Sequence, residues 1–454
     1  MNILLSTPEQ PVCAVAIVLG DENSTSALDR LPKRTYQVVV DSKLPEYEQL
    51  EQIRKACYDV CDFARKDKVN VLCLDCANLQ EQQLFAAVEG LSLADYSFDR
   101  FKSDVPSHIE TLYVPHPAIS QAKIDECQRL MNRIFWCREW INLPVANLNA
   151  EQFADELAAV AHDLKIKCTV FDKKQLQSLR MGGLLAVNKG SVDEPRFVLL
   201  EYFPENSDPQ PFALVGKGIM YDTGGLNIKP DDYMCEMKSD MAGAATMASV
   251  LFAAADNNLP VHLVALLPLT DNRPGFNAYA ADDILTMYDG TSVEIVNTDA
   301  EGRLILADAI AFAAANYNPS LIIDAATLTG AAVRAISTFG IAAMHQNAAE
   351  PMARLEAAGN EVHERIAQFP FWNEYGDLIK SEVADIKNCG PAQAGTITAG
   401  KFLAHFAKQF PFIHLDIAGV AYFSKPQAPF RIGASGYGIR LLYRYLKSLK
   451  TLKK

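Results

Sequence analysis

The sequence predicts an α/β protein of two domains, a smaller amino-terminal α/β domain and a larger carboxyl-terminal one with a central mixed, largely parallel sheet flanked by helices. Runs of β-forming residues alternate with helical patterns in both halves of the chain, which is typical of layered α/β architecture. Several runs in the second half are almost wholly apolar, as strands covered on both faces must be. A length of 454 residues also favours two or three domains over one.

The first half contains the elements of a small α/β layer and shows no chemistry of its own. We expect strands at residues 12–20, 35–42, 69–76 and 108–115, and helices at 46–65 and 81–89. A helical pattern begins near residue 121, breaks at Pro144, and resumes as a helix over 151–164. The break places the domain junction, with an amino-terminal domain at 1–137, a connecting helical segment at 138–165 and the larger domain at 166–454.

The second half repeats the alternation with more buried strands. The expected strands are 196–203, 212–218, 261–269, 292–298, 320–327 and 412–419, and the expected helices are 242–255, a helix from about 304, and 438–449. In open α/β sheets, ligands bind at the carboxyl ends of the strands. Polar residues that follow these strands are therefore candidates for a site.

Bulk properties exclude several classes of protein. A net charge of −13 and a pI near 5.2 argue against a general nucleic-acid or anionic-membrane surface, although a local basic patch stays open. The longest apolar run, residues 304–315, contains Asp308 and is too short to span a bilayer, so we expect no transmembrane helix. Ten scattered cysteines and a start without a secretory signal predict a reducing, cytoplasmic location.

Charged residues gather in three segments at the apparent ends of strands. These are "VGKGIMYDTGGLNIKP" with Lys217, Asp222 and Lys229, "EMKSDMAGAA" with Asp240, and "VNTDAEGRL" with Asp299, Glu301 and Arg303. Crowded carboxylates cannot all stay ionised without positive charge among them, and bound divalent cations supply it. Oxygen-rich ligation suits magnesium, manganese or zinc. No HExxH occurs and no histidine adjoins these segments, so a zincin site is rejected.

The segment "VNTDAEGRL" has two readings. Thr298 and Glu301 fit a capping box that would open a helix over 303–316. An extended segment would instead present Asp299, Glu301 and Arg303 to one cavity, because alternate residues of a strand face the same side. The glycines of "GKG" and "DTGG" fit turns with positive φ, and the spacing of a phosphate-binding loop is missing.

These segments resemble the signature stretches of the leucyl aminopeptidase family, the cytosolic di-metal aminopeptidases of peptidase type M17. The resemblance runs from "MGGLLAVNKGS" at Met181 through "DAATLTGA", "VADIKN", "AGTITAGKFL" and "HLDIAG" to "ASGYGIRLL" near Leu442. It covers most of the larger domain and none of the amino-terminal one. "NTDAEGRL" is an eight-residue match in the right order with its companions.

The resemblance implies a site with two divalent metal ions, Mn²⁺ or Zn²⁺. The implied metal ligands are Lys217, Asp222, Asp240, Asp299 and Glu301, with Asp222 and Glu301 bridging the two ions. A lysine ligand must be neutral, and two adjacent cations supply the field that lowers its pKa.

The implied reaction is hydrolysis of the amino-terminal peptide bond of peptide substrates by a water that bridges the two metals. Lys229 would stabilise the oxyanion, and Arg303 would hold a bicarbonate ion that acts as general base. The implied substrate pocket contains Met237, Asn297, Thr327 and Leu328, with a preference for Leu and similar apolar residues. The family also implies a homohexamer.

The sequence departs from the family at two places, and two rival functions stay open. Ala281-Asp282-Asp283 stands where the family usually has Pro-Gly-Asp, which affects local geometry, since aspartate tolerates a left-handed backbone. Ala150 replaces a usual proline. The rivals are an additional DNA-binding or regulatory role, as in some bacterial relatives, and a di-metal phosphoesterase.

Overall fold

The computed structural model describes residues 1–6, 13–19, 35–76, 78–205 and 207–449, and contacts divide them into two compact units. The first unit contains the described residues of Met1–Phe135, joined by Glu361–His363 and Phe423–Ser435. The second contains those of Trp136–Asn360, Glu364–Tyr422 and the described residues from Gly436 onward. Two short segments from late in the sequence thus complete the first unit. Residues 450–454 of the larger predicted domain lie outside the described residues.

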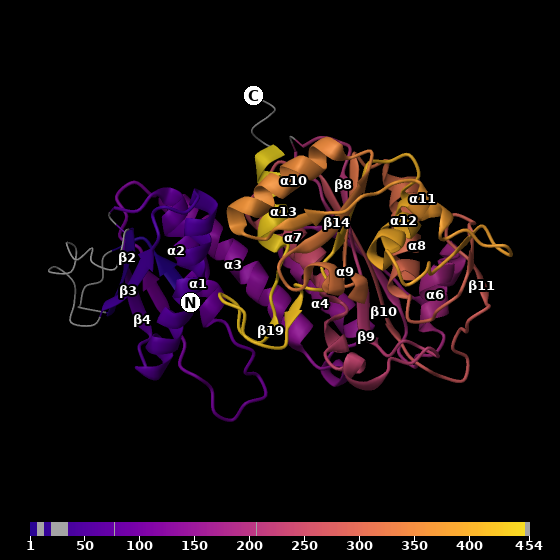
Figure 1. Ribbon diagram of the computed structural model, residues 1–454, viewed down its shortest axis with the longest axis horizontal. Helices are drawn as coiled ribbons and strands as arrows, with labels where there is room; N and C mark the ends of the chain where they lie inside the picture. Colours follow the sequence, from indigo (N-terminus) through magenta and orange to yellow (C-terminus); the bar gives the residue numbers. More distant parts are fainter. Residues whose placement is uncertain (7–12, 20–34, 77, 206, 450–454) are drawn as a thin grey trace. The chain divides into compact units, whose positions relative to one another are not determined.

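The first unit contains a parallel sheet of five strands in the order β1-β5-β4-β2-β3. Figure 1 labels β2, β3 and β4 among them. The strands are β1 (Asn2–Leu4), β2 (Cys13–Leu19), β3 (Thr35–Val40), β4 (Val71–Asp75) and β5 (Thr111–Tyr113). Helix α1 (Glu46–Lys66) packs against α2 (Glu81–Asp95), which is longer than predicted. Val12 and Gly20, the ends of the first predicted strand, lie outside the described residues.

Three helical elements connect the sheets. Helix α3 (Gln121–Asn142) is followed by the 3₁₀ turn η2 (Val145–Asn147) and by α4 (Ala150–Asp163). The chain breaks at Pro144, as predicted, because proline lacks the N–H that a continuing helix needs. Asn149 caps α4: its side chain accepts a hydrogen bond from the Gln152 N–H, and the Gln152 side chain accepts one from the Asn149 N–H.

The second unit is built on a mixed sheet of nine strands, which confirms the predicted fold class. Eight run in the order β15-β14-β17-β13-β8-β10-β7-β6, and β9 pairs with β10. The central pairs β17/β13, β13/β8 and β8/β10 are parallel, whereas β14/β17, β10/β7 and β7/β6 are antiparallel. The strands are β6 (Lys167–Phe171), β7 (Arg196–Tyr202), β8 (Phe212–Gly216), β9 (Gly218–Asp222), β10 (Leu263–Asn272), β13 (Leu321–Ala326), β14 (Ile341–Gln346), β15 (Ile366–Gln368) and β17 (Phe412–Asp416).

Helices cover both faces of this sheet. Helices α6 (Gly182–Asn188), α8 (Gly302–Tyr317) and α12 (Gly395–Ala407) share one apolar cluster with strand residues such as Ala213 and Val215. On the opposite face, α7 (Ala242–Asp256) packs on β8 and β10, and α13 (Ile439–Leu449) packs on α7 (Figure 1). Burial on both faces explains why β8, β10 and β13 read as continuous apolar runs.

Among the remaining elements of the two units, one small sheet matters for the site. In it β12 (Ser292–Glu294) pairs with β11 (Ile284–Thr286) and, in parallel, with β16 (Ile386–Lys387). The strand predicted over 292–298 therefore ends at Glu294. The other elements are α5 (Lys173–Leu179), η3 (Asp231–Met234), η4 (Met237–Ser239), α9 (Gly330–Ile336), α10 (Ala349–Val362), α11 (Glu374–Asp377), β18 (Tyr422–Phe423) and β19 (Gly433–Ala434).

Polar residues gather at the carboxyl ends of the central strands. Lys217 follows β8, Asp222 ends β9, Asn272 ends β10, Thr327 follows β13 and Asp416 ends β17. Because these strands are mutually parallel, their carboxyl ends meet at one edge of the sheet, as the sequence predicted for a ligand site. Among the described residues, no helix is both long enough and apolar enough to cross a membrane.

Candidate metal and catalytic site

Lys217 lies at the centre of a buried cluster of charges. Its Nζ is 2.7 Å from Asp240 Oδ2 and 2.9 Å from Glu301 Oε1, and it donates a hydrogen bond to the Thr327 carbonyl at 3.1 Å. The lysine is only 2% exposed. Gly302 makes this position available, because a Cβ atom there would lie 2.1 Å from Lys217 Cε. A glycine is therefore needed where α8 begins.

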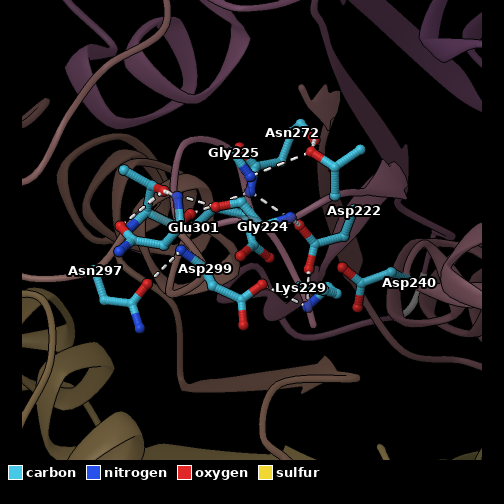
Figure 2. A network of polar contacts seen from close by, with 12 residues as sticks. Asp222, Gly224, Gly225, Lys229, Asp240, Asn272, Asn297, Asp299 and Glu301 are labelled. Carbon is cyan, nitrogen blue, oxygen red and sulfur yellow. Dashed lines mark hydrogen bonds and ion pairs between the residues drawn. The ribbon is translucent and has the colours of Figure 1, made fainter. Parts of the chain in front are cut away.

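Lys229 joins the two carboxylates on the other side of the cluster. Its Nζ lies 2.7 Å from Asp222 Oδ2 and 2.6 Å from Asp299 Oδ1 (Figure 2). The chain reaches this position through a turn after β9, in which Gly224 has φ +85° and donates its N–H to Asp222 Oδ1. Positive φ is the conformation that the sequence predicted for this glycine.

The segment 296–304 is neither a capping box nor an extended strand. Residues 298 and 299 form a turn, α8 begins at Gly302, and Glu301 at the N-cap makes no side-chain cap hydrogen bond. The Thr298 hydroxyl instead donates to the Gly224 carbonyl at 2.6 Å and accepts from the Asn227 N–H at 2.8 Å. The predicted helix forms as α8 (Gly302–Tyr317), but the predicted capping box and the extended conformation are wrong, because contacts with the glycine turn, distant in sequence, override the local signal.

Three residues that the sequence analysis did not single out hold this turn. Asn272 Nδ2 donates to Asp222 Oδ1 at 2.9 Å and to the Thr298 carbonyl at 3.1 Å. The Tyr279 hydroxyl donates to the same carbonyl at 2.7 Å, and Asn388, the residue after β16, accepts a hydrogen bond from the Val296 N–H at 2.8 Å. Two polar residues at strand ends, Asn272 and Asn388, were the available signals in the sequence.

The structure also tests whether the residues suit a metal ion. One carboxylate oxygen each from Asp222, Asp299 and Glu301 lies within 4.8 Å of the other two, and no histidine belongs to this group of described residues. Glu301 Oε2 is buried and has no hydrogen-bond partner, which is rare for a buried polar atom. Oxygen ligands with a spare acceptor atom fit a divalent cation.

Burial and mutual repulsion perturb the whole cluster. Burial, together with the charge of Asp222, raises the pKa values of the Asp299 and Glu301 carboxyls. Burial also raises the pKa of Asp240, although Lys217 opposes that shift. For Lys217, burial lowers the pKa, but the Asp240, Glu301 and Asp222 carboxylates raise it by more, so the ammonium form is favoured.

Lys229 follows the same rule, since burial lowers its pKa and the surrounding carboxylates raise it above the usual value. The two ammonium groups thus balance part of the negative charge in the metal-free chain.

Arg303 lies in the first turn of α8. Its Nη1 donates to the Asn388 carbonyl at 2.8 Å, while its Nε is buried and has no hydrogen-bond partner. Burial lowers the pKa of the guanidinium. A buried arginine with an unused donor is suited to an anion.

The four residues expected in the substrate pocket are connected to the cluster to different degrees. Thr327 donates its hydroxyl to Asp240 Oδ1 at 2.8 Å, and Asn297 Oδ1 accepts from the Asp299 N–H at 2.8 Å. The Met237 carbonyl accepts from the Asp240 N–H at 3.3 Å. Leu328 is partly buried against the core, and its N–H donates to Asp416. None of the described hydrogen bonds joins these four to one another.

The departure at 281–283 has a left-handed backbone at its central residue. Asp282 stands where the family usually has glycine and adopts φ +71°. Its neighbour Asp283 accepts a hydrogen bond from the Ala280 N–H, which closes the turn. Aspartate can therefore occupy this position, because it tolerates a left-handed backbone better than most residues.

Comparisons with known proteins identify chains that are similar to this one. A family model described as the cytosol aminopeptidase family, catalytic domain, matches residues 135–443. The probable cytosol aminopeptidase of Chlorobaculum tepidum is 41% identical over 442 residues, covering 90% of this chain and 86% of that relative. The probable cytosol aminopeptidase of Geobacter sulfurreducens is 40% identical, covering 79% and 74%. Among solved structures, the bottromycin maturation enzyme BotP in complex with Mn has a TM-score of 0.87 at 28% identity, covering 97% of this chain and 100% of that one.

Proposed function

Because the chain belongs to the cytosol aminopeptidase family of metallo-exopeptidases, as the sequence resemblance indicated, we propose that it releases amino-terminal residues from peptides with two divalent metal ions. The proposed metal ligands are Lys217, Asp222, Asp240, Asp299 and Glu301. The observation that carries the proposal is the convergence of three buried or half-buried carboxylates beside a buried lysine at the carboxyl edge of the sheet.

The ligand set supports a pair of ions. Lys217 contacts Asp240 and Glu301, and Lys229 contacts Asp222 and Asp299. With Asp222 and Glu301 as bridges, Asp299 would complete one metal site and Lys217 with Asp240 would complete the other. Two bound cations would supply a Lewis acid and an acidified bridging water for attack on the peptide carbonyl. Mn²⁺ is the first metal to test, since the similar BotP structure contains it, and Zn²⁺ is the second.

Lys229 and Arg303 have the proposed catalytic roles. Lys229 is charged and only partly buried, so its ammonium would stabilise the negative oxygen of a tetrahedral intermediate. Arg303 would bind a bicarbonate ion as general base, and its buried, unpartnered Nε supports an anion there. This assignment gives the site a base without a histidine.

Met237, Asn297, Thr327 and Leu328 are the proposed lining of the substrate side-chain pocket. Two of them are apolar and partly buried, which supports a preference for Leu and similar apolar amino-terminal residues. A homohexamer and a cytoplasmic location are also proposed, the latter from the word cytosol in the relatives' names. Family membership favours peptides over phosphoesters, and no specific observation favours a second role in DNA binding.

Hydrolysis of leucinamide by metal-stripped protein tests the proposal. We expect no activity without metal, recovery on titration with Mn²⁺ or Zn²⁺, and loss of turnover when the substrate's α-amine is acetylated. Asp299→Asn should lower the metal affinity. If neither metal restores hydrolysis of any peptide with a free amine, the proposed function is wrong.

A further inference from the structure

Asn388 is a fully buried amide that contacts the segment carrying Asp299 and Glu301. It ends the quoted stretch "VADIKN", but the sequence analysis gave it no role. It follows β16, which pairs with β12, and its N–H donates to the Glu294 carbonyl at 2.9 Å. This pairing places the Asn388 side chain beside the segment that connects β12 to α8.

The side chain uses both of its functional groups on that segment. Its Oδ1 accepts from the Val296 N–H at 2.8 Å and from the Asn297 N–H at 3.3 Å. Its Nδ2 donates to the Asn297 carbonyl at 2.8 Å and to the Ala300 carbonyl at 3.5 Å. The contacts therefore extend over the residues on both sides of Asp299 and up to the residue before Glu301.

The backbone of the same residue reaches Arg303. The Asn388 carbonyl accepts a hydrogen bond from Arg303 Nη1 at 2.8 Å. This is the hydrogen bond that the guanidinium makes to another described residue. Asn388 thus fixes the turn with its side chain and the arginine with its main chain. Few other side chains could do so: of the buried polar types, only an amide presents an acceptor and a two-proton donor on one planar group.

We propose that Asn388 is a positioning residue that sets the geometry of Asp299 and Glu301 as metal ligands and links it to that of Arg303. The inference rests on the proposed function, because it takes these two carboxylates as ligands. When a residue that orients metal ligands through hydrogen bonds is replaced, metal affinity or activity typically falls by roughly 10- to 100-fold. The same range is expected here.

The test compares Asn388→Asp with Asn188→Asp in the full-length protein. Aspartate keeps the shape and the acceptor for Val296 but places an oxygen against the Asn297 carbonyl. Asn188 is the matched control: it is 1% exposed, and its Nδ2 donates to the Asp193 carbonyl at 2.8 Å and to Thr270 Oγ1 at 3.2 Å. Both substitutions thus replace a buried donor in the second unit, but only one contacts the turn.

The readouts are Mn²⁺ affinity, measured from free Mn²⁺ by electron paramagnetic resonance, the melting temperature, and kcat and KM for leucinamide. We expect Asn388→Asp to weaken Mn²⁺ binding by about 10- to 100-fold and to lower kcat more than it raises KM. Excess Mn²⁺ should recover part of kcat. Asn188→Asp should bind Mn²⁺ as the wild type does, even if its melting temperature falls equally.

Wild-type Mn²⁺ affinity in Asn388→Asp, or an equal loss in Asn188→Asp, would overturn the inference. If Asn388→Asp does not fold, Asn388→Ser removes the amide without adding a charge, and the same loss of affinity is expected from it. Failure of the proposed function has a different signature, because the wild type itself would then neither bind Mn²⁺ nor hydrolyse leucinamide, and both proposals would fall.

Discussion

Gly302→Ala separates the geometry of the cluster from the stability of the fold. The new Cβ would lie 2.1 Å from Lys217 Cε, and ordinary contact begins near 3.4 Å, so the lysine end must move by about 1.3 Å. Overpacking typically costs about 1–3 kcal/mol, and the better helix propensity of alanine returns up to about 1 kcal/mol. The free energy of unfolding should therefore fall by roughly 0–3 kcal/mol.

The effect on activity should be much larger than the effect on stability. Lys217 Nζ is held by Asp240, Glu301 and the Thr327 carbonyl, so it cannot move by an ångström without losing these contacts. A displacement of that size at a reacting centre costs on the order of 100-fold in rate. We expect kcat/KM for leucinamide to fall by about 100-fold while the protein stays folded at 25 °C.

The assay is steady-state hydrolysis at saturating Mn²⁺, with urea unfolding of the same samples. Gly376→Ala is the matched control, because Gly376 lies in α11 and a Cβ there would meet nothing within 4 Å. It should retain wild-type activity. If Gly302→Ala also retains it, or if both variants lose activity in proportion to their stability, the reasoning about Lys217 is refuted.

Three further predictions follow from the charges. Lys229→Met should lower kcat by about 100- to 1,000-fold in steady-state assays, which is the usual loss when one oxyanion donor is removed. An unchanged kcat would contradict the proposal that Lys229 stabilises the oxyanion. Mn²⁺ binding should tighten as pH rises and should release protons, because the Lys217 ammonium must lose a proton before it can bind metal. Calorimetry in buffers of different ionisation enthalpy measures the number of protons released. Release of no protons would count against Lys217 as a ligand. In the first unit, the hydrogen bond with Asp95 raises the pKa of His108 above 6.5. Its stabilising contribution should be complete below pH 6.5 and lost as pH rises through the folded-state pKa; urea unfolding of wild type and His108→Gln at pH 5.5–8.5 should show their difference shrinking.

The sequence predicted the sheets well where burial on both faces left a clear apolar run. It failed over 328–411, where no element was expected although β14, α10 and α12 form there. The α12 segment "GTITAGKFLAHFA" contains residues of low helix propensity, and its burial against α8 decides its conformation. Propensity is a weak local signal, and tertiary packing overrides it in such segments.

The site shows the same division between local and long-range information. The charged residues were identified because they lie in short motifs, and the structure places them together. The roles of Asn272 and Asn388 were missed, although Asn388 ends the quoted stretch "VADIKN", because their partners lie far away in sequence: Asn272 bonds Asp222 across 50 positions and Asn388 bonds Asn297 across 91. The sequence alone does not show which strand ends become neighbours. The false capping box at Thr298 has the same cause, since its partners come from the turn after β9.

The charge balance of the cluster explains how the chain can assemble it before metal is present. Four carboxylates brought together at this edge would repel one another strongly in a low-dielectric interior. Lys217 and Lys229 each lie within 2.9 Å of two of them, so the chain provides its own cations during folding. Under the proposed function, metal binding would then displace ammonium contacts from carboxylates already in place. We therefore expect the metal-free protein to be folded, with native near-ultraviolet circular dichroism, and an unfolded metal-free protein would show that the lysines do not fill this role.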